Sequence, residues 1–580
     1  MDQASFDHPQ LDPARRRFLK ASLLASMSGV MAPWAANFAV IGAAAAATAN
    51  DYKALVCVFL YGGNDYANTL IPYDTANYAR YQSLRPSLAY SYASLQATAL
   101  NPRQIPTDVQ GVARHYALAP ELAPLLPIFD AGKMAVLLNV GTLIQPTSKA
   151  QYLAKSVPLP SKLFSHNDQQ SEWQSSGAEG TTTGWGGRCE DLFVAANSNP
   201  VFSCVNLYGN AVFLSGDACS QYQISSSGAV ALTALNSLFG STAAATALRT
   251  IATGSSAHLL AADHSAVMAQ ALSAKQVLTT ALAAAPTLNT VFPTANRLGD
   301  QLKMVAKMTS VAQTLGVKRQ VFFVALSGFD THNNLGTLHP TLLTEVADAL
   351  AAFYSATVEL GLAANITSFT ASDFGRTLTV NNEGSDHGWG SMHFIVGGAV
   401  QGQQFYGTPP AVANNGADDV GQGRLLPTTS VDQYAATLGK WFGNSDAQLL
   451  RVLPNLANFP ASGRNLGFML SPLSAPSAPT LNSVSFGIGS ATFSFSPPTN
   501  EGSSAISSYT VSCTADGQAP QTMSGNGSPI TVKGLSGGVA YQCTVTATNA
   551  DGLTSSASLA LAVTPKKKSA IAPILLLLLD

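Results

Sequence analysis

Two apolar runs that each end in an aspartate enclose a helical segment in this 580-residue chain. The first is FFVALSGFDTH, which delivers Asp330, and the second is ITSFTASDFGRT, which delivers Asp373. Between them, residues 338–361 place apolar side chains three and four positions apart, the pattern of an amphipathic helix ending at Gly361. The succession predicts a βαβ unit, with two parallel neighbouring strands whose carboxyl ends share one edge of a sheet.

Further side chains with oxygen or nitrogen atoms are expected at the same edge. The run KALVCVFL predicts a buried strand that ends at Asp65, after a glycine pair that permits a sharp turn. His332 closely follows Asp330, and the segment GSDHGWG returns His387 toward this edge. Ligands of open α/β sheets bind at the carboxyl ends of strands. The pattern therefore predicts a site for one or two divalent ions, with zinc, manganese and calcium all compatible.

Each of these residues also has a purely structural interpretation. Asp65 can cap the next helix, and Asp330 with His332 can form an Asx-type turn that leaves the imidazole in solvent. Ser165 begins a predicted helix, where a serine is usually an N-cap but also presents its hydroxyl beside backbone N–H groups that hold anions. For an ester hydrolase, we expect Ser165 to be the nucleophile and Arg376 to be an oxyanion partner.

The low charge of the chain excludes one class of function. Charged residues make up 11% of the sequence and the formal net charge is −2, whereas an average soluble domain has roughly 25% charged residues. Basic residues cluster only within the first twenty positions and in a three-lysine run near the C-terminus. We therefore expect no nucleic-acid partner.

The first 49 residues predict export. The sequence ARRRFLK at residues 14–20 matches the twin-arginine pattern, and an apolar stretch follows that ends in AAAAATAN. The alternative is an N-terminal membrane anchor, but the small residues favour cleavage near residues 47–49. We expect the mature protein in the periplasm, outside the cell or at the cell surface. Twin-arginine substrates cross the membrane folded, which suits a protein that acquires a metal beforehand.

Composition divides the remaining chain. Residues 50–470 predict an α/β domain, and a linker rich in Pro, Ser and Ala follows at 471–481. Residues 482–565 contain short alternating runs with turns between them, which predicts a β-sandwich. The last segment, 566–580, is a basic run with an apolar tail, too short for the roughly 20 residues that a membrane span needs. A sorting tail, a membrane contact and a truncated end all remain open.

The order of the motifs SYTV, GLSGGVAY and VTATNADG in the sandwich region resembles a bacterial fibronectin type III domain. The resemblance implies that Tyr541 is the tyrosine corner of that fold. It also implies that Cys513 and Cys543 face each other on adjacent strands, where they can form a disulfide. Such modules usually act as spacers or binding domains, so we expect no chemistry there. In the larger region, Cys57 is expected to be a buried free thiol.

A second series of motifs lies between residues 54 and 407: YGGNDYANTLIPYD, SHNDQQSEWQ, TGWGGR, GFDTH, ASDFGRT, SDHG, and FIVGGAVQG followed by YGTPP. They resemble the exported bacterial family known as domain of unknown function 1501, grouped with the alkaline phosphatase and sulfatase superfamily. The resemblance implies an α/β fold with a central mixed, largely parallel sheet flanked by helices. In active members it also implies two metals, here at Asp65, Asp330, His332, Asp373 and His387, and a nucleophile at Ser165.

The chain departs from this pattern at three points. Phe374 stands where active members of the superfamily have a metal-binding histidine. The family more often has glutamate at position 373, and Asp330 and His332 are closer than the usual pair. A one-metal hydrolase, a ligand set that uses Asp386 or His393, and a scaffold without catalysis all fit these departures.

Two functions follow from the sequence. The first is an exported, metal-dependent hydrolase of phosphate or sulfate esters, acting on a small ester or on a cell-surface polymer. The second is a non-catalytic surface or matrix protein that retains the fold. Phe374, the fibronectin-like module and the apolar tail motivate this alternative. In either case, the C-terminal module and tail are expected to associate with the cell surface or membrane.

Overall fold

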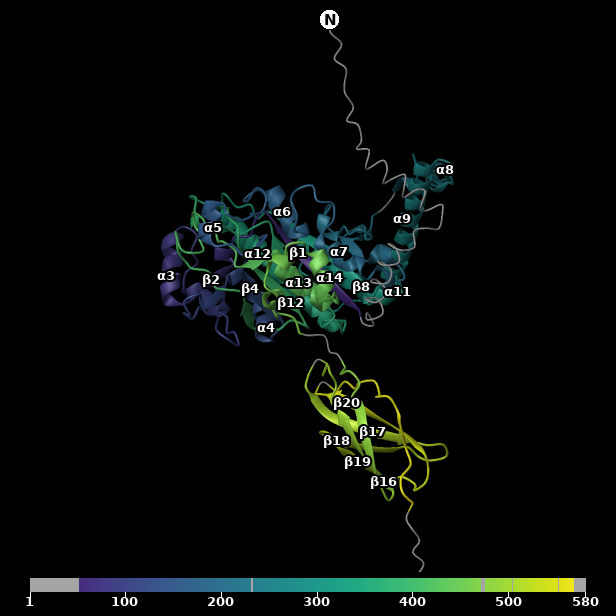
Figure 1. Cartoon of the computed structure of the whole chain (residues 1–580). Helices are drawn as coiled ribbons and strands as arrows, with labels where there is room; N and C mark the ends of the chain where they lie inside the picture. The colour runs from purple at the N-terminus through teal and green to yellow at the C-terminus, as the bar shows by residue number, and fades with distance from the viewer. Residues whose placement is uncertain (1–51, 231–232, 471–474, 503, 551, 568–580) are drawn as a thin grey trace, which may run out of the picture. The chain divides into compact units, whose positions relative to one another are not determined.

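The structure is a computed structural model that describes residues 52–230, 233–470, 475–502, 504–550 and 552–567 (Figure 1). The twin-arginine segment and residues 568–580 of the tail lie outside the described residues. The chain divides into two compact units, residues 1–470 and 471–580. Unit 1 is a mixed α/β fold, and the secondary structure of the described residues of unit 2 consists of strands. Within the described residues, no helix is both long enough and apolar enough to cross a membrane.

A mixed, largely parallel sheet forms the centre of unit 1. Its strand order is β13-β4-β12-β9-β1-β8-β5-β6-β7, and β14 pairs with β4. β12 is antiparallel to both of its neighbours. The strands are β1 (Lys53–Tyr61), β4 (Met134–Gly141), β5 (Cys204–Asn206), β6 (Gln221–Ser225), β7 (Gly228–Ala229), β8 (Arg319–Ser327), β9 (Ile366–Ser372), β12 (Ser391–Gly397), β13 (Gln404–Tyr406) and β14 (Thr429–Ser430).

Strand β1 lies between the two strands of the predicted βαβ unit. β8 and β9 are joined by helix α12 (Leu335–Glu359), but each pairs in parallel with β1 and not with the other. The prediction that they are adjacent is therefore wrong. β1 takes the central place because both of its faces are apolar and buried. The three strands remain parallel, so their carboxyl ends still share one edge.

The two faces of the sheet belong to two separate hydrophobic cores. Val56 and Val58 of β1 pack in the core that includes α10 (Arg297–Ser310) and α12. Leu55, Cys57 and Phe59 pack in the core that includes α7 (Trp185–Asp191) and α13 (Val431–Phe442). Cys57 is a buried free thiol, as predicted. This alternation follows from the two-residue period of a strand.

Shorter elements surround these layers. The remaining helices of unit 1 are α3 (Thr75–Leu84), α4 (Leu126–Asp130), α5 (Lys149–Ala154), α6 (His166–Ser175), α8 (Thr242–Thr253), α9 (Leu259–Ala283), α11 (Ala312–Leu315) and α14 (Asp446–Val452). Two small antiparallel strand pairs also belong to unit 1: β2 (Leu70–Pro72) with β3 (Tyr116–Leu118), and β10 (Arg376–Val380) with β11 (Ser385–His387).

The buried Asp432 in α13 makes the stability of unit 1 sensitive to pH. Burial raises the pKa of this carboxyl group to about 7. Between about pH 4 and pH 7 the folded protein keeps a proton that the unfolded chain releases, so the free energy of unfolding falls as pH rises. Asp432→Asn should remove this fall in the free energy of unfolding. At pH 8 it should stabilise unit 1 by up to about 4 kcal/mol, and at pH 4 it should have little effect.

Urea unfolding at both pH values, followed by tryptophan fluorescence, measures this effect. The four tryptophans among the described residues all lie in unit 1. The exposed Asp263 of α9 provides a control variant, Asp263→Asn, which should behave like the unmodified chain at both pH values. An equal response of the Asp432 variant and the control would contradict the assignment.

Unit 2 is a two-sheet sandwich. One sheet contains β15 (Thr480–Gly487), β16 (Ser490–Ser496) and β19 (Ile530–Lys533), and the other contains β18 (Gln521–Gly525), β17 (Ile506–Thr514), β20 (Tyr541–Asn549) and β21 (Leu561–Val563). Cys513 and Cys543 are directly opposite on β17 and β20 and form a disulfide. The Tyr541 hydroxyl accepts the backbone N–H of Ser536 at 3.0 Å. Both implications of the fibronectin resemblance are therefore confirmed.

Candidate metal site

Glycines at the end of β1 allow the segments of the site to approach closely. Gly62 and Gly63 have φ angles of 117° and 85°, in the region that favours glycine. A Cβ atom on Gly62 would overlap the Asp330 backbone, and one on Gly63 would overlap the ring of Phe374. The glycine pair predicted to form a turn thus also brings the ends of β1, β8 and β9 together.

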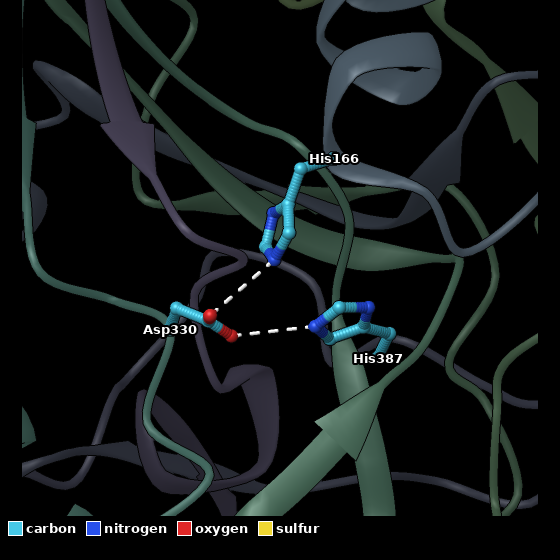
Figure 2. A group of neighbouring side chains, drawn as sticks. All are labelled: His166, Asp330 and His387. Atoms are coloured by element: carbon cyan, nitrogen blue, oxygen red, sulfur yellow. Dashed lines mark hydrogen bonds and ion pairs between the residues drawn. The ribbon is translucent and has the colours of Figure 1, made fainter.

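Three histidines surround the carboxylate of Asp330. Figure 2 shows His166 of α6 and His387 of β11 directed toward it. Nε2 of His166 lies 3.5 Å from Oδ2 of Asp330, and Nε2 of His387 lies 3.3 Å from Oδ1. Nε2 of His332 is 3.3 Å from the same Oδ1 and 2.9 Å from Nε2 of His387. One ligand atom each from His166, Asp330 and His387 lie within 4.8 Å of one another.

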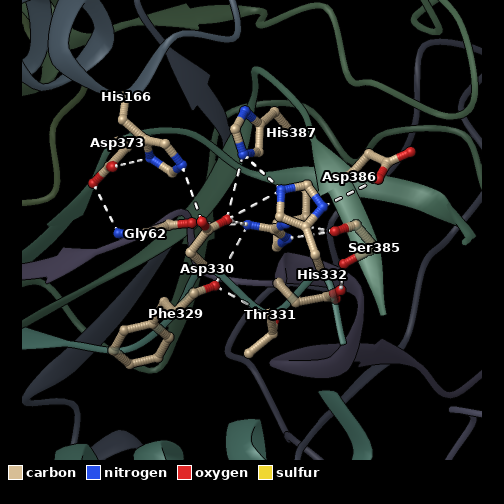
Figure 3. Close-up of polar contacts among 12 residues, drawn as sticks. Gly62, His166, Phe329, Asp330, Thr331, His332, Asp373, Ser385, Asp386 and His387 are labelled. Carbon is tan, nitrogen blue, oxygen red and sulfur yellow. Dashed lines mark hydrogen bonds and ion pairs between the residues drawn. The ribbon is translucent and has the colours of Figure 1, made fainter. Parts of the chain in front are cut away.

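The other ring nitrogen of each histidine faces a group that can only accept a hydrogen bond, and Figure 3 shows these partners for His166 and His332. Nδ1 of His166 lies 2.6 Å from the Asp373 carboxylate, and Nδ1 of His332 lies 3.2 Å from that of Asp386. Nδ1 of His387 lies 2.7 Å from the Phe164 carbonyl oxygen. These partners assign the hydrogen of each neutral ring to Nδ1. In this tautomer the Nε2 atoms of His166 and His387 carry no hydrogen and face the Asp330 carboxylate, and Nε2 of His332 lies 3.3 Å from the same carboxylate.

A positive charge at its centre would stabilise such a group of acceptors. Imidazole nitrogen with carboxylate oxygen is a common ligand set for zinc and related transition metals. Histidine ligands usually donate their second N–H to a carboxylate or a carbonyl, as all three do here. The residues therefore fit a metal ion.

Asp373 stands behind His166. Its buried carboxylate faces His166 Nδ1 and also accepts Gln170 Nε2 at 2.8 Å and the Gly62 N–H at 3.2 Å. The hydrogen bond that His166 donates to Asp373 raises the pKa of His166 above its ordinary value. We predicted that Asp373 is a metal ligand. In the structure its geometry is instead that of a residue that orients the ligand His166.

Arg376 is fully buried and holds the site together. It donates to the Ser385 carbonyl at 2.9 Å, to the Gly62 carbonyl at 2.8 Å and to Oδ1 of Asp330 at 3.0 Å. Partial burial acts to raise the pKa of Asp330, but the hydrogen bond and charge of Arg376, together with His166, hold it below its ordinary value. Its donors are directed at the protein, which suits a positioning residue and not the oxyanion partner that we predicted.

Asp65 does not join this group. Its carboxylate forms a buried ion pair with Arg85 at 2.6 Å, and both side chains are almost inaccessible to solvent. It also accepts the Ser385 hydroxyl at 2.7 Å and the Asn68 N–H at 3.0 Å, which caps the short helix Tyr66–Asn68. The capping interpretation thus describes what Asp65 does in the structure.

Ser165 occupies the N-cap position of α6, immediately before His166. Its hydroxyl donates to Oδ2 of Asp168 at 3.0 Å and does not cap the helix backbone. Within the described chain, no hydrogen bond joins this hydroxyl to Asp330 or to a histidine of the site.

Phe374 fills the space beside the histidines. Its ring is buried, and its centroid lies 4.9 Å from that of His166 and 4.7 Å from that of His387. His393, the alternative ligand, is a core residue, with its ring 4.8 Å from Trp173 and its pKa lowered by burial to about 3. The other alternative, Asp386, lies behind His332.

Sequence reasoning missed His166 as a candidate ligand. It precedes Asp330 by more than 150 positions and shows no local ligand spacing. The one available signal was its place at the start of a helix, next to Ser165 in a motif that already carried the family resemblance.

Comparisons with known proteins agree with this division of the chain. A family model described as "Protein of unknown function (DUF1501)" matches residues 52–453, and a fibronectin type III domain model matches residues 474–564. A comparison with curated proteins finds no match.

One similar solved structure is the fibronectin type III domain of human "fibronectin type III domain containing protein 3". It is 26% identical to the matched part of this chain, and the match covers 18% of this chain and 97% of that chain with a TM-score of 0.16. Another is a human fibronectin type III domain described as the fourth, with 24% identity. The match covers 17% of this chain and 85% of that chain, with a TM-score of 0.15. Since the first family model covers more than half of the sequence, the chain belongs to the family of proteins of unknown function DUF1501, and it carries a C-terminal fibronectin type III domain.

Proposed function

We propose that this chain is an exported, metal-dependent hydrolase of phosphate or sulfate esters, built on a fold of the alkaline phosphatase and sulfatase type. The observation that supports it is that ligand atoms of His166, Asp330 and His387 lie within 4.8 Å of one another. His166, His387 and Asp330 would hold the ion, with His332 beside them, 3.3 Å from the same carboxylate. Bound there, a divalent ion acts as a Lewis acid that polarises an ester oxygen and acidifies a hydroxyl.

The charges around the site favour one ion. Asp330, Asp373 and Asp386 carry three negative charges, and the buried Arg376 offsets one of them. A single divalent cation would neutralise the remaining two. We therefore propose one zinc or manganese ion and leave Asp65, which Arg85 already neutralises, out of the ligand set.

Ser165 is the proposed nucleophile. Its hydroxyl hydrogen points at the buried carboxylate of Asp168, which can accept the proton as Oγ attacks phosphorus or sulfur and the ester oxygen leaves. Water would then cleave the seryl ester. The substrate would be a small ester or a cell-surface polymer, with the fibronectin type III domain as a spacer or surface contact.

The alternative is a non-catalytic surface protein that retains the fold. The Phe374 ring favours it, because it fills space beside His166 and His387 and leaves less room for a second ion. This protein would still bind one metal ion but would not turn over esters.

Metal analysis and ester turnover of the exported protein test the proposal. We expect about one transition metal ion per chain and hydrolysis of aryl phosphates or aryl sulfates. Ser165→Ala should lower turnover by at least about 1,000-fold and leave the metal content unchanged, because it removes the nucleophile but no ligand.

Ser445→Ala provides the matched control. Ser445 is also an N-cap serine, at α14, and its loss should reduce stability without changing turnover. Protein without a stoichiometric metal ion would contradict the metal site. Turnover that survives in Ser165→Ala would contradict the role of Ser165, and bound metal without any turnover would favour the alternative function.

A further inference from the structure

Arg424 lies beside the metal site with part of its guanidinium group free of protein partners. Its Nε donates to the main-chain oxygen of His387 at 2.7 Å, and its Nη1 donates to the Gly421 carbonyl at 3.3 Å. The structure gives Nη2 no hydrogen bond or ion pair with any described residue. The side chain is half-buried, and Nη2 is not among the buried side-chain atoms without a partner, so solvent reaches this nitrogen.

A loop held by internal hydrogen bonds positions this arginine. The buried carboxylate of Asp419 accepts the backbone N–H groups of Asn415, Gly421 and Gly423 at 2.6, 2.6 and 2.8 Å. The N–H of Arg424 donates to the Gly421 carbonyl at 3.0 Å, which closes a turn. Because the backbone is already ordered, little conformational entropy is lost when the side chain binds a ligand.

Phe164 contacts both Arg424 and His387. The guanidinium carbon lies 5.1 Å from the centroid of the Phe164 ring, a cation–π contact. The Phe164 carbonyl oxygen lies 2.7 Å from His387 Nδ1. The backbone φ angle of Phe164 is 73°, which is rare for an aromatic residue. Arg424 thus contacts both His387 and the residue that orients the ring of His387.

The site needs a further cation if it is to receive an anion. Arg376 directs its donors at Asp330 and at backbone carbonyls, and the proposed divalent ion would be neutralised by the remaining carboxylates. Lys162 is exposed and lies near two carboxylates, 3.6 Å from Asp168 and 3.7 Å from Glu179. Arg424 is the cation that contacts a proposed ligand residue and keeps a donor nitrogen open to solvent.

We propose that Arg424 binds the anionic oxygens of the substrate and so makes the site selective for phosphate or sulfate groups over neutral esters. The inference rests on the proposed function. A planar guanidinium suits such oxyanions because its N–H donors lie in one plane.

Calorimetric titration of zinc-loaded, full-length mature protein with inorganic phosphate and with sulfate tests this role. We expect Arg424→Met to weaken phosphate binding at least about 10-fold, because a charge-assisted hydrogen bond is lost, with zinc content unchanged. Arg424→Lys, which keeps the positive charge but not the planar donors, should bind phosphate more tightly than Arg424→Met and more weakly than the unmodified chain. Arg451→Met, which changes an exposed arginine on α14, should bind phosphate as the unmodified chain does.

Equal phosphate affinity in the Arg424→Met and Arg451→Met variants would overturn the role of Arg424 and leave the proposed hydrolase intact. Loss of zinc from Arg424→Met would also overturn it, since the arginine would then serve only to hold His387. Conversely, phosphate binding that depends on Arg424 in a protein without ester turnover would reject the hydrolase and support the anion site.

Discussion

Asp330→Asn is expected to abolish metal binding and ester turnover together. Asparagine has nearly the same shape, but it removes the carboxylate on which His166, His332 and His387 converge. Its amide N–H groups would also donate to the bare Nε2 atoms that a metal requires. Residues behind metal ligands typically contribute 10- to 100-fold to affinity, so we expect a loss of at least about 100-fold in zinc affinity and about 1,000-fold in turnover.

A folding control separates this effect from general damage. Asp330 also pairs with the buried Arg376, so the variant should be somewhat less stable but still folded. Its circular dichroism should match that of Asp263→Asn, which alters an exposed aspartate on α9 and should retain metal and activity. A folded Asp330→Asn protein that still binds one zinc ion with unchanged affinity would refute the proposed ligand set.

Arg85→Met should strongly destabilise unit 1. The variant leaves the Asp65 carboxylate buried without its partner and removes the donor to the carbonyl oxygens of Thr377 and Leu378. Removing one member of a buried ion pair typically costs about 3–5 kcal/mol. Urea unfolding monitored by tryptophan fluorescence should show a loss of this size in the free energy of unfolding.

Two further variants complete this test. Arg80→Met alters an exposed arginine on the neighbouring helix α3 and should cost less than about 0.5 kcal/mol. Adding Asp65→Leu to Arg85→Met removes the uncompensated charge, so the double variant should recover part of the loss. If Arg85→Met proved as stable as Arg80→Met, Asp65 would be free to act elsewhere, including as a metal ligand.

Local patterns predicted the fold class well. The apolar runs that become β1, β8 and β9 are buried on both faces, and a short continuous apolar run bounded by turn residues indicates such a strand. The turn-rich region beyond residue 475 forms the expected sandwich with its disulfide and tyrosine corner. The order of strands was less predictable, because the insertion of β1 between β8 and β9 depends on pairing between segments more than 250 positions apart.

The candidate site, like the fold, could be predicted only in part. Asp330, His332, Asp373 and His387 follow strand ends in one stretch of sequence, so their gathering at one edge could be predicted. Their separate roles could not. Asp65 and Asp373 both follow buried strands, yet one pairs with Arg85 and the other orients His166.

The sequence by itself determined the strands, the helix between them, the C-terminal sandwich and the position of an acidic and imidazole-rich edge, because these depend on hydrophobic period and on turns that span a few residues. Only the tertiary structure decided which side chains face Asp330. His166 comes from a helix start far from β8 in sequence and is placed by its hydrogen bond to Asp373. Arg424 lies on a loop that folding brings to the main chain of His387. Side-chain roles in the site therefore depend on long-range contacts that no local pattern encodes.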